Sequence, residues 1–118
     1  MKLKILSIHE KGNAEKEYVW LEVVDDCDLC YYGLADTTYT PDGKISSKLR
    51  HFYWFSPTAA KKGERVVLRT GPGKNGKYTS QSGTLVHRFF WELGSAVWND
   101  DGDAAVLFEM STWKTTRA

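Results

Sequence analysis

The sequence predicts an all-β domain built as a two-sheet antiparallel β-sandwich. Apolar residues recur at a period of two in most segments, which is the pattern of strands. Turn sequences such as Pro41-Asp42-Gly43 and Asn75-Gly76 separate these segments and supply the backbone conformations that reversals need. No stretch has the pattern of a helix of ten or more residues, so we expect the fold to be made of strands alone.

Seven strands are expected, and four of them alternate clearly. Val19, Leu21 and Val23 alternate in the second strand, and Val66 and Leu68 alternate in the fifth. In the sixth, Leu85, His87, Phe89 and Trp91 face one way and Val86, Arg88 and Phe90 face the other. The seventh interleaves Ala104, Val106 and Phe108 with Ala105, Leu107 and Glu109. The expected strands lie near residues 2–8, 17–24, 30–36, 49–56, 65–70, 85–91 and 104–110. Seven short strands at this spacing fit a sandwich better than an open sheet.

Composition indicates a single globular domain over residues 1–118. The chain has 42% hydrophobic and 26% charged residues, values typical of a folded domain that needs no metal or disulfide for stability. The N-terminal segment 1–9 lacks the apolar run of a signal peptide, and no stretch approaches a membrane span. A small exported domain usually carries more than two cysteines, so we expect a cytoplasmic protein without membrane contact.

Three stretches, taken in order, are similar to a known family. They are residues 17–24 (Glu-Tyr-Val-Trp-Leu-Glu-Val-Val) followed by Gly33-Leu-Ala-Asp36, residues 62–71 (Lys-Gly-Glu-Arg-Val-Val-Leu-Arg-Thr-Gly), and residues 98–108 (Trp-Asn-Asp-Asp-Gly-Asp-Ala-Ala-Val-Leu-Phe). Over about residues 2–110 the chain resembles the lamin tail domain, in a form also found in bacterial proteins. The resemblance implies an immunoglobulin-like sandwich that serves as a scaffold or interaction module, and it implies no catalytic residues. Two positions depart from the family pattern: Lys62 replaces a usual proline, and no glycine follows Glu109.

One glycine-rich segment matches the residue pattern of a phosphate-binding motif but lacks the structural context that the motif requires. Residues 71–77 read Gly-Pro-Gly-Lys-Asn-Gly-Lys, which fits the first seven positions of a P-loop. Tyr78 then stands where a magnesium-binding Ser or Thr is required, and no helix follows to point its N-terminus at a phosphate. We expect a long glycine-rich hairpin loop and no nucleotide cofactor.

The two cysteines and the histidines give no complete site. Cys27 and Cys30 form a C-x-x-C pair, but zinc needs two further ligands, and nearby aspartates disfavour the thiolate that redox chemistry uses. His51, His87 and Ser56 lack the sequence context of a nucleophile with its base. We therefore expect no metal, no cofactor and no enzymatic activity.

Two groups of side chains are candidates for contact surfaces. The aromatic blocks at residues 51–55 and 89–91 place rings on both faces of a strand, so Phe52, Trp54 and Phe90 are candidates for an exposed aromatic surface. A core strand that is covered on both faces would explain the same blocks, and we favour that alternative.

Charge is unevenly distributed along the chain although its net value is only +1. Between residues 44 and 88 ten basic residues accompany one acid, Glu64, whereas acids collect at 10–36 and 92–109. Lys61, Lys62, Arg69, Lys74 and Lys77 are candidates for one basic patch that binds phosphate or an acidic protein. Alternatively, basic strands pair with acidic strands and the charges mix, which is the arrangement we favour.

These observations predict a non-catalytic interaction or scaffold module. Its expected partner is a protein, including a second copy of itself. The alternative is a nucleic-acid-binding accessory domain that uses the basic segment 44–88, although a dedicated nucleic-acid-binding domain is usually basic overall.

Overall fold

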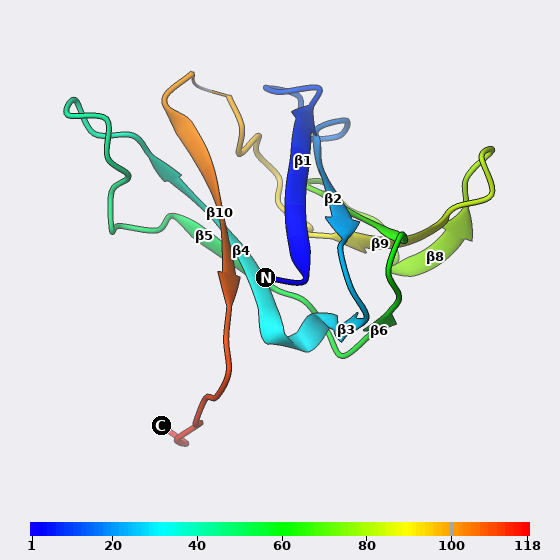
Figure 1. The fold of residues 1–118 in the computed structure, drawn as a ribbon. Helices are drawn as coiled ribbons and strands as arrows, with labels where there is room; N and C mark the ends of the chain where they lie inside the picture. Colours follow the sequence, from blue (N-terminus) through cyan, green and yellow to red (C-terminus); the bar gives the residue numbers. More distant parts are fainter. Residues whose placement is uncertain (100) are drawn as a thin grey trace.

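Strands make up nearly all the regular structure of the protein (Figure 1). The computed structural model describes residues 1–99 and 101–118, so Asp100 lies outside the described residues. Within those residues the single helix is the 3-10 turn η1 (Leu29–Tyr31), and no helix is long and apolar enough to cross a membrane. The all-β prediction is confirmed.

The strands form one large sheet, one smaller sheet and a short ladder. The five-stranded sheet has the order β1 (Leu3–His9), β2 (Tyr18–Val23), β7 (Arg65–Arg69), β9 (Leu85–Phe90) and β8 (Gly76–Thr79). The three-stranded sheet has the order β10 (Asp103–Glu109), β4 (Tyr32–Thr38) and β5 (His51–Trp54). The ladder pairs β3 (Cys27–Asp28) with β6 (Ala59–Ala60). Each of the seven predicted segments contains a strand, and β3, β6 and β8 are additional.

One strand pair corrects the expectation of an entirely antiparallel sandwich. β7 and β9 are parallel, with Val66 beside His87 and Leu68 beside Phe89. The chain leaves β7 through residues 70–75, forms β8 at the edge of the sheet, and returns through a tight turn to β9. β9 lies between β7 and β8, antiparallel to β8 and parallel to β7. A parallel pair needs such a long connection, which here contains β8 itself.

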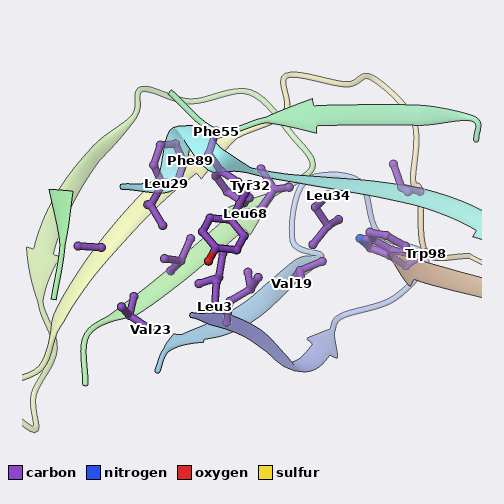
Figure 2. Packing of buried hydrophobic residues seen from close by; sticks show 14 residues of the cluster. Leu3, Val19, Val23, Leu29, Tyr32, Leu34, Phe55, Leu68, Phe89 and Trp98 are labelled. Carbon is purple, nitrogen blue, oxygen red and sulfur yellow. The ribbon is translucent and has the colours of Figure 1, made fainter. Parts of the chain in front are cut away.

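The two larger sheets face each other across one hydrophobic core. Val19, Leu21 and Leu68 come from the five-stranded sheet, and Tyr32 and Leu34 come from β4. All five side chains are almost completely buried. Figure 2 shows Trp98 at one end of the cluster and Phe55 with Phe89 at the other. The alternation predicted from the sequence appears directly in β2, whereas β4 and β7 bury consecutive residues because they are inner strands.

A buried carboxylate ties three distant segments to this core. Glu17 has no exposed surface and precedes β2. Its Oε2 accepts hydrogen bonds from the Thr70 hydroxyl at 2.6 Å and from the Val97 N–H at 2.8 Å, and a longer one from the Trp98 N–H at 3.3 Å. Its Oε1 accepts from the Gly12 N–H at 3.2 Å. A buried charge is tolerated when it is satisfied in this way.

Candidate functional site

Aromatic side chains cover the outer face of the three-stranded sheet. Phe52 and Trp54 of β5 point away from the core, and both are more than 40% exposed. The Phe52 ring lies directly over Gly33 of β4 and packs against Phe108 of β10, with 5.9 Å between ring centres. Gly33 is needed there, because a Cβ at that position would lie 2.0 Å from the Phe52 ring.

The C-terminal tail extends this apolar surface. Trp113 meets Trp54 edge to face at 4.8 Å and lies 5.8 Å from Tyr31. The Trp54 indole N–H donates a 2.7 Å hydrogen bond to the carbonyl of Cys30, so its ring is fixed in place. We call this surface the aromatic face; it consists of Tyr31, Phe52, Trp54, Phe108 and Trp113. Contiguous exposed rings of this kind are typical of contact sites.

Gly33→Ala is expected to rearrange the aromatic face without unfolding the domain. The new methyl group must displace the Phe52 ring, and that ring is free to swing into solvent, so the cost should be near the low end of overpacking, about 1 kcal/mol. NMR chemical shifts of the Phe52 and Phe108 rings should change. Gly94→Ala is the matched control, because a Cβ at Gly94 meets no atom within 4 Å. Unmoved Phe52 resonances would contradict the packing described.

Phe90 lies apart from the other two aromatic residues predicted with it. It belongs to β9 of the five-stranded sheet, whereas Phe52 and Trp54 belong to β5. The Phe90 ring covers Gly73, where a Cβ would lie 2.3 Å away, and the Arg88 guanidinium lies 5.5 Å from the ring centre. The three candidates are therefore divided between two sheets.

The five predicted basic residues are also distributed over separate sites. Lys61 and Lys62 lie in the turn before β7, and Arg69 is the last residue of that strand. The Lys62 N–H donates to Asp26 at 2.9 Å, so acidic and basic segments meet at this end of the sheet. Lys74 lies in the crossover after β7, and Lys77 of β8 lines a hollow on the core side. Arg69 alone of the five lines the groove described next.

A groove of about 400 Å³ crosses the outer face of the five-stranded sheet. It is lined by Ser7, His9, Tyr18, Trp20, Val67, Arg69 and Tyr78. We call it the arginine–tyrosine groove. Arg69 is the one lining residue that the sequence pattern indicated as a contact residue. Alternation along the strands could have predicted that Tyr18, Trp20 and Tyr78 face outward. Only the order of the strands shows that these three side chains line one groove.

The glycine-rich segment 71–77 is not the hairpin loop expected: residues 71–75 belong to the crossover from β7 to β8, and Gly76 and Lys77 begin β8. The Gly71 carbonyl accepts from the Glu92 N–H at 3.2 Å, and the Asn75 side chain accepts from the Phe90 N–H at 2.9 Å. A Cβ at Gly71 would lie 2.9 Å from the carbonyl oxygen of Ala14. The glycines therefore allow the chain to pass closely over the end of β9. The hairpin turn comes later, between β8 and β9.

Two histidines each contact a carboxylate. His51 Nδ1 lies 3.0 Å from Asp36, and buried His87 Nε2 lies 2.9 Å from Glu64. Burial raises the pKa of Glu64, but hydrogen bonds from the Lys61 N–H and from His87 outweigh it, so the pKa is lowered overall. Ser56 shares a hollow with His87, yet no hydrogen bond joins them among the described residues.

The C-x-x-C pair lies in β3 and η1 as two free cysteines. Asp28 caps η1 by accepting hydrogen bonds from the N–H groups of Cys30 and Thr58, each at 3.0 Å. Burial raises the pKa of both thiols, and Asp28 raises both further. The neutral thiol is therefore favoured. Across residues 1–99 and 101–118 no three His, Cys, Asp or Glu side chains are grouped as metal ligands.

No protein-family model matches this chain, and no curated protein matches its sequence. The aromatic face and the arginine–tyrosine groove are therefore interpreted from their own chemistry.

Proposed function

We propose that this chain is an immunoglobulin-like domain of the lamin tail type and acts as a non-catalytic interaction module. The stretches that resemble the family correspond to β2 with its approach, part of β4, β7 with its flanking residues, and the approach to and most of β10. These four strands carry much of the hydrophobic core. Two packed sheets and a family resemblance centred on core strands support this proposal.

The aromatic face is the observation that carries the interaction role. Four of its side chains, Tyr31, Phe52, Trp54 and Trp113, are each more than 40% exposed. Trp113 contacts both Tyr31 and Trp54, and Phe52 contacts Phe108. Aromatic residues are enriched at protein interfaces, and tryptophan is prominent among residues whose loss weakens binding most. A protein partner that covers this face would remove a large apolar area from water.

Basic residues in the neighbouring segments indicate the charge of the partner. The segments that adjoin the aromatic face in sequence, residues 40–50 before β5 and 110–118 after β10, contain the exposed basic residues Lys44, Lys48, Lys114 and Arg117, and Asp42 is the sole acid in these two segments. Arg50 is also exposed but pairs with Asp103 at 3.4 Å. Two copies that met through this face would bring like charges together, which disfavours a symmetric dimer. The partner is therefore an apolar protein segment flanked by carboxylates.

A peptide-display selection on the immobilised domain tests this proposal. Selected peptides should have an aromatic or aliphatic centre with Asp or Glu on its flanks. Trp54→Ala should weaken a selected peptide by about 30-fold, which corresponds to a hot spot of about 2 kcal/mol. Tyr78→Ala is the matched control, because Tyr78 is similarly exposed but lies in the other sheet. Thermal unfolding of each variant verifies that the fold is intact.

Charge reversal provides an independent measurement. Lys48→Glu with Lys114→Glu should weaken the same peptides, whereas Lys11→Glu with Lys16→Glu, in the β1–β2 connection, should not. Selected peptides without acidic flanks would contradict the proposal, as would equal losses in both charge-reversed variants. A dimer that Trp54→Ala dissolves in sedimentation experiments would replace the acidic partner with a second copy of the chain.

A further inference from the structure

The arginine–tyrosine groove combines flat rings with positive charge. Tyr18 lies between two partners: the His9 ring stacks on it at 4.8 Å with 16° between planes, and the Arg69 guanidinium lies 4.9 Å from the ring centre. Trp20 and Tyr78 line the same groove, so it contains ring surfaces from β1, β2 and β8. These strands span four interstrand spacings, or about 19 Å.

A second arginine borders the groove and has unused hydrogen-bonding capacity. The Arg88 guanidinium lies 5.4 Å from the Tyr78 ring centre and 5.5 Å from that of Phe90. Its Nε is buried and has no hydrogen-bond partner among the described residues. Because the buried Nε is closed to solvent, the terminal N–H groups of the guanidinium are the donors that Arg88 can offer to an anion in the groove.

The charge of the two arginines is not neutralised by neighbouring acids. Arg65, on the same face of β7, forms an ion pair with Glu22 at 3.3 Å. Neither Arg69 nor Arg88 has such a pair within residues 1–99 and 101–118, and no Asp or Glu is among the residues that line the groove. This half of the sheet therefore presents positive charge beside exposed rings.

Unpaired nucleic acid has the chemistry that complements this groove. Guanidinium groups bind phosphates through several N–H donors, and aromatic rings stack on bases that are not paired. A duplex offers phosphates but keeps its base faces inside the stack, so it would use the arginines and leave the rings uncovered. An acidic peptide would likewise use the charge without requiring a row of rings.

We propose that the arginine–tyrosine groove binds a short stretch of single-stranded nucleic acid. Arg69 and Arg88 contact the phosphates, and Tyr78 and Trp20 provide the surfaces for bases. This site lies on the outer face of the five-stranded sheet and is independent of the aromatic face, which lies on the other sheet. It does not require Lys61, Lys62 or Lys77, which the structure places elsewhere.

Fluorescence anisotropy with labelled single-stranded oligonucleotides of mixed sequence, measured over a range of salt concentrations, tests the proposal. Affinity should fall with salt, and a logarithmic slope of about −1.4 would correspond to two phosphate contacts. Arg88→Gln should make the slope shallower by about 0.7. Tyr78→Ala should weaken binding about fivefold or more at constant salt, because it removes a stacking surface and no charge.

Lys77→Gln is the matched control. Lys77 is the neighbour of Tyr78 on β8, but it lines the hollow on the other side of the sheet. Its loss removes one positive charge and should leave both affinity and slope nearly unchanged. Thermal unfolding verifies that each variant is folded.

Three results would overturn the proposal. One is the absence of binding at low salt. Another is an equal effect of Lys77→Gln and Arg88→Gln, which would indicate a diffuse charge effect. The third is competition by inorganic polyphosphate or duplex DNA as effective as that by single strands at equal phosphate concentration, together with an unchanged affinity in Tyr78→Ala.

Discussion

Glu17→Ala is expected to lower the free energy of unfolding by about 3–5 kcal/mol. The substitution removes a fully buried carboxylate that accepts four hydrogen bonds, and the N–H groups of Gly12, Val97 and Trp98 lose an acceptor. Breaking a buried charged network by removing one partner typically costs about 3–5 kcal/mol. A domain of this kind has roughly 5–15 kcal/mol in total, so a large fraction of its stability would be lost.

Urea unfolding followed by tryptophan fluorescence measures this loss. Glu17→Gln retains the shape and one acceptor oxygen, but its NH₂ group must face an N–H donor, so we expect an intermediate loss. Glu15→Ala removes an exposed carboxylate two residues away and should change the free energy of unfolding by less than about 0.5 kcal/mol. A Glu17→Ala protein with nearly unchanged stability would show that the buried carboxylate is not a structural link.

Trp98→Ala is the second substitution with a large expected effect. Trp98 is the largest of the fully buried side chains, lies at one end of the core and contacts Trp91 at 6.3 Å between ring centres. Replacing a buried tryptophan with alanine leaves a cavity and typically costs about 3–5 kcal/mol. Its position beside Val97 also connects this cavity to the hydrogen bonds of Glu17.

Trp98→Phe separates ring packing from the indole N–H. The Nε1 of Trp98 is buried and has no hydrogen-bond partner in the described part of the chain. Phenylalanine removes this unsatisfied donor and keeps part of the ring volume, so its cost should be less than half that of alanine. Chemical denaturation measures both variants. Equal costs would show that the indole N–H has an acceptor in solution.

The sequence predicted the strands well where alternation was long enough to be visible. β2, β7, β9 and β10 each span five or more residues, and the burial of β2 alternates as predicted. In β7 Val66, Val67 and Leu68 are all buried, and in β9 the neighbours Val86 and His87 are both buried, so these two central strands depart from the alternation. β3 and β6 have two residues each, too few for any period. β8 begins at Gly76 and all of its residues are exposed, so its sequence has no alternation of apolar and polar residues that would predict a strand. Its existence depends on pairing with β9, which local sequence does not encode.

For the candidate sites too, features within one strand could be predicted, whereas contacts between strands could not. The alternation of side chains along β5 correctly predicts that Phe52 and Trp54 lie on the same face of the strand. It does not show that Phe90 belongs to another sheet. The charge runs of the sequence became ion pairs at some places, as between Arg65 and Glu22, and isolated arginines at others. The order of the strands in the sheet decides whether a basic side chain lies beside an acidic one. That order cannot be predicted from local sequence patterns.

The insertion of β9 between β7 and β8 has a consequence for synthesis on the ribosome. Strands of the larger sheet are not added in the order in which they are translated, since β8 emerges before the strand that holds it in place. Until residue 90 is outside the exit tunnel, β7 has one open edge and β8 has no neighbour. An open edge can pair with other chains, so the nascent protein passes through a period of vulnerability that ends when β9 closes the gap.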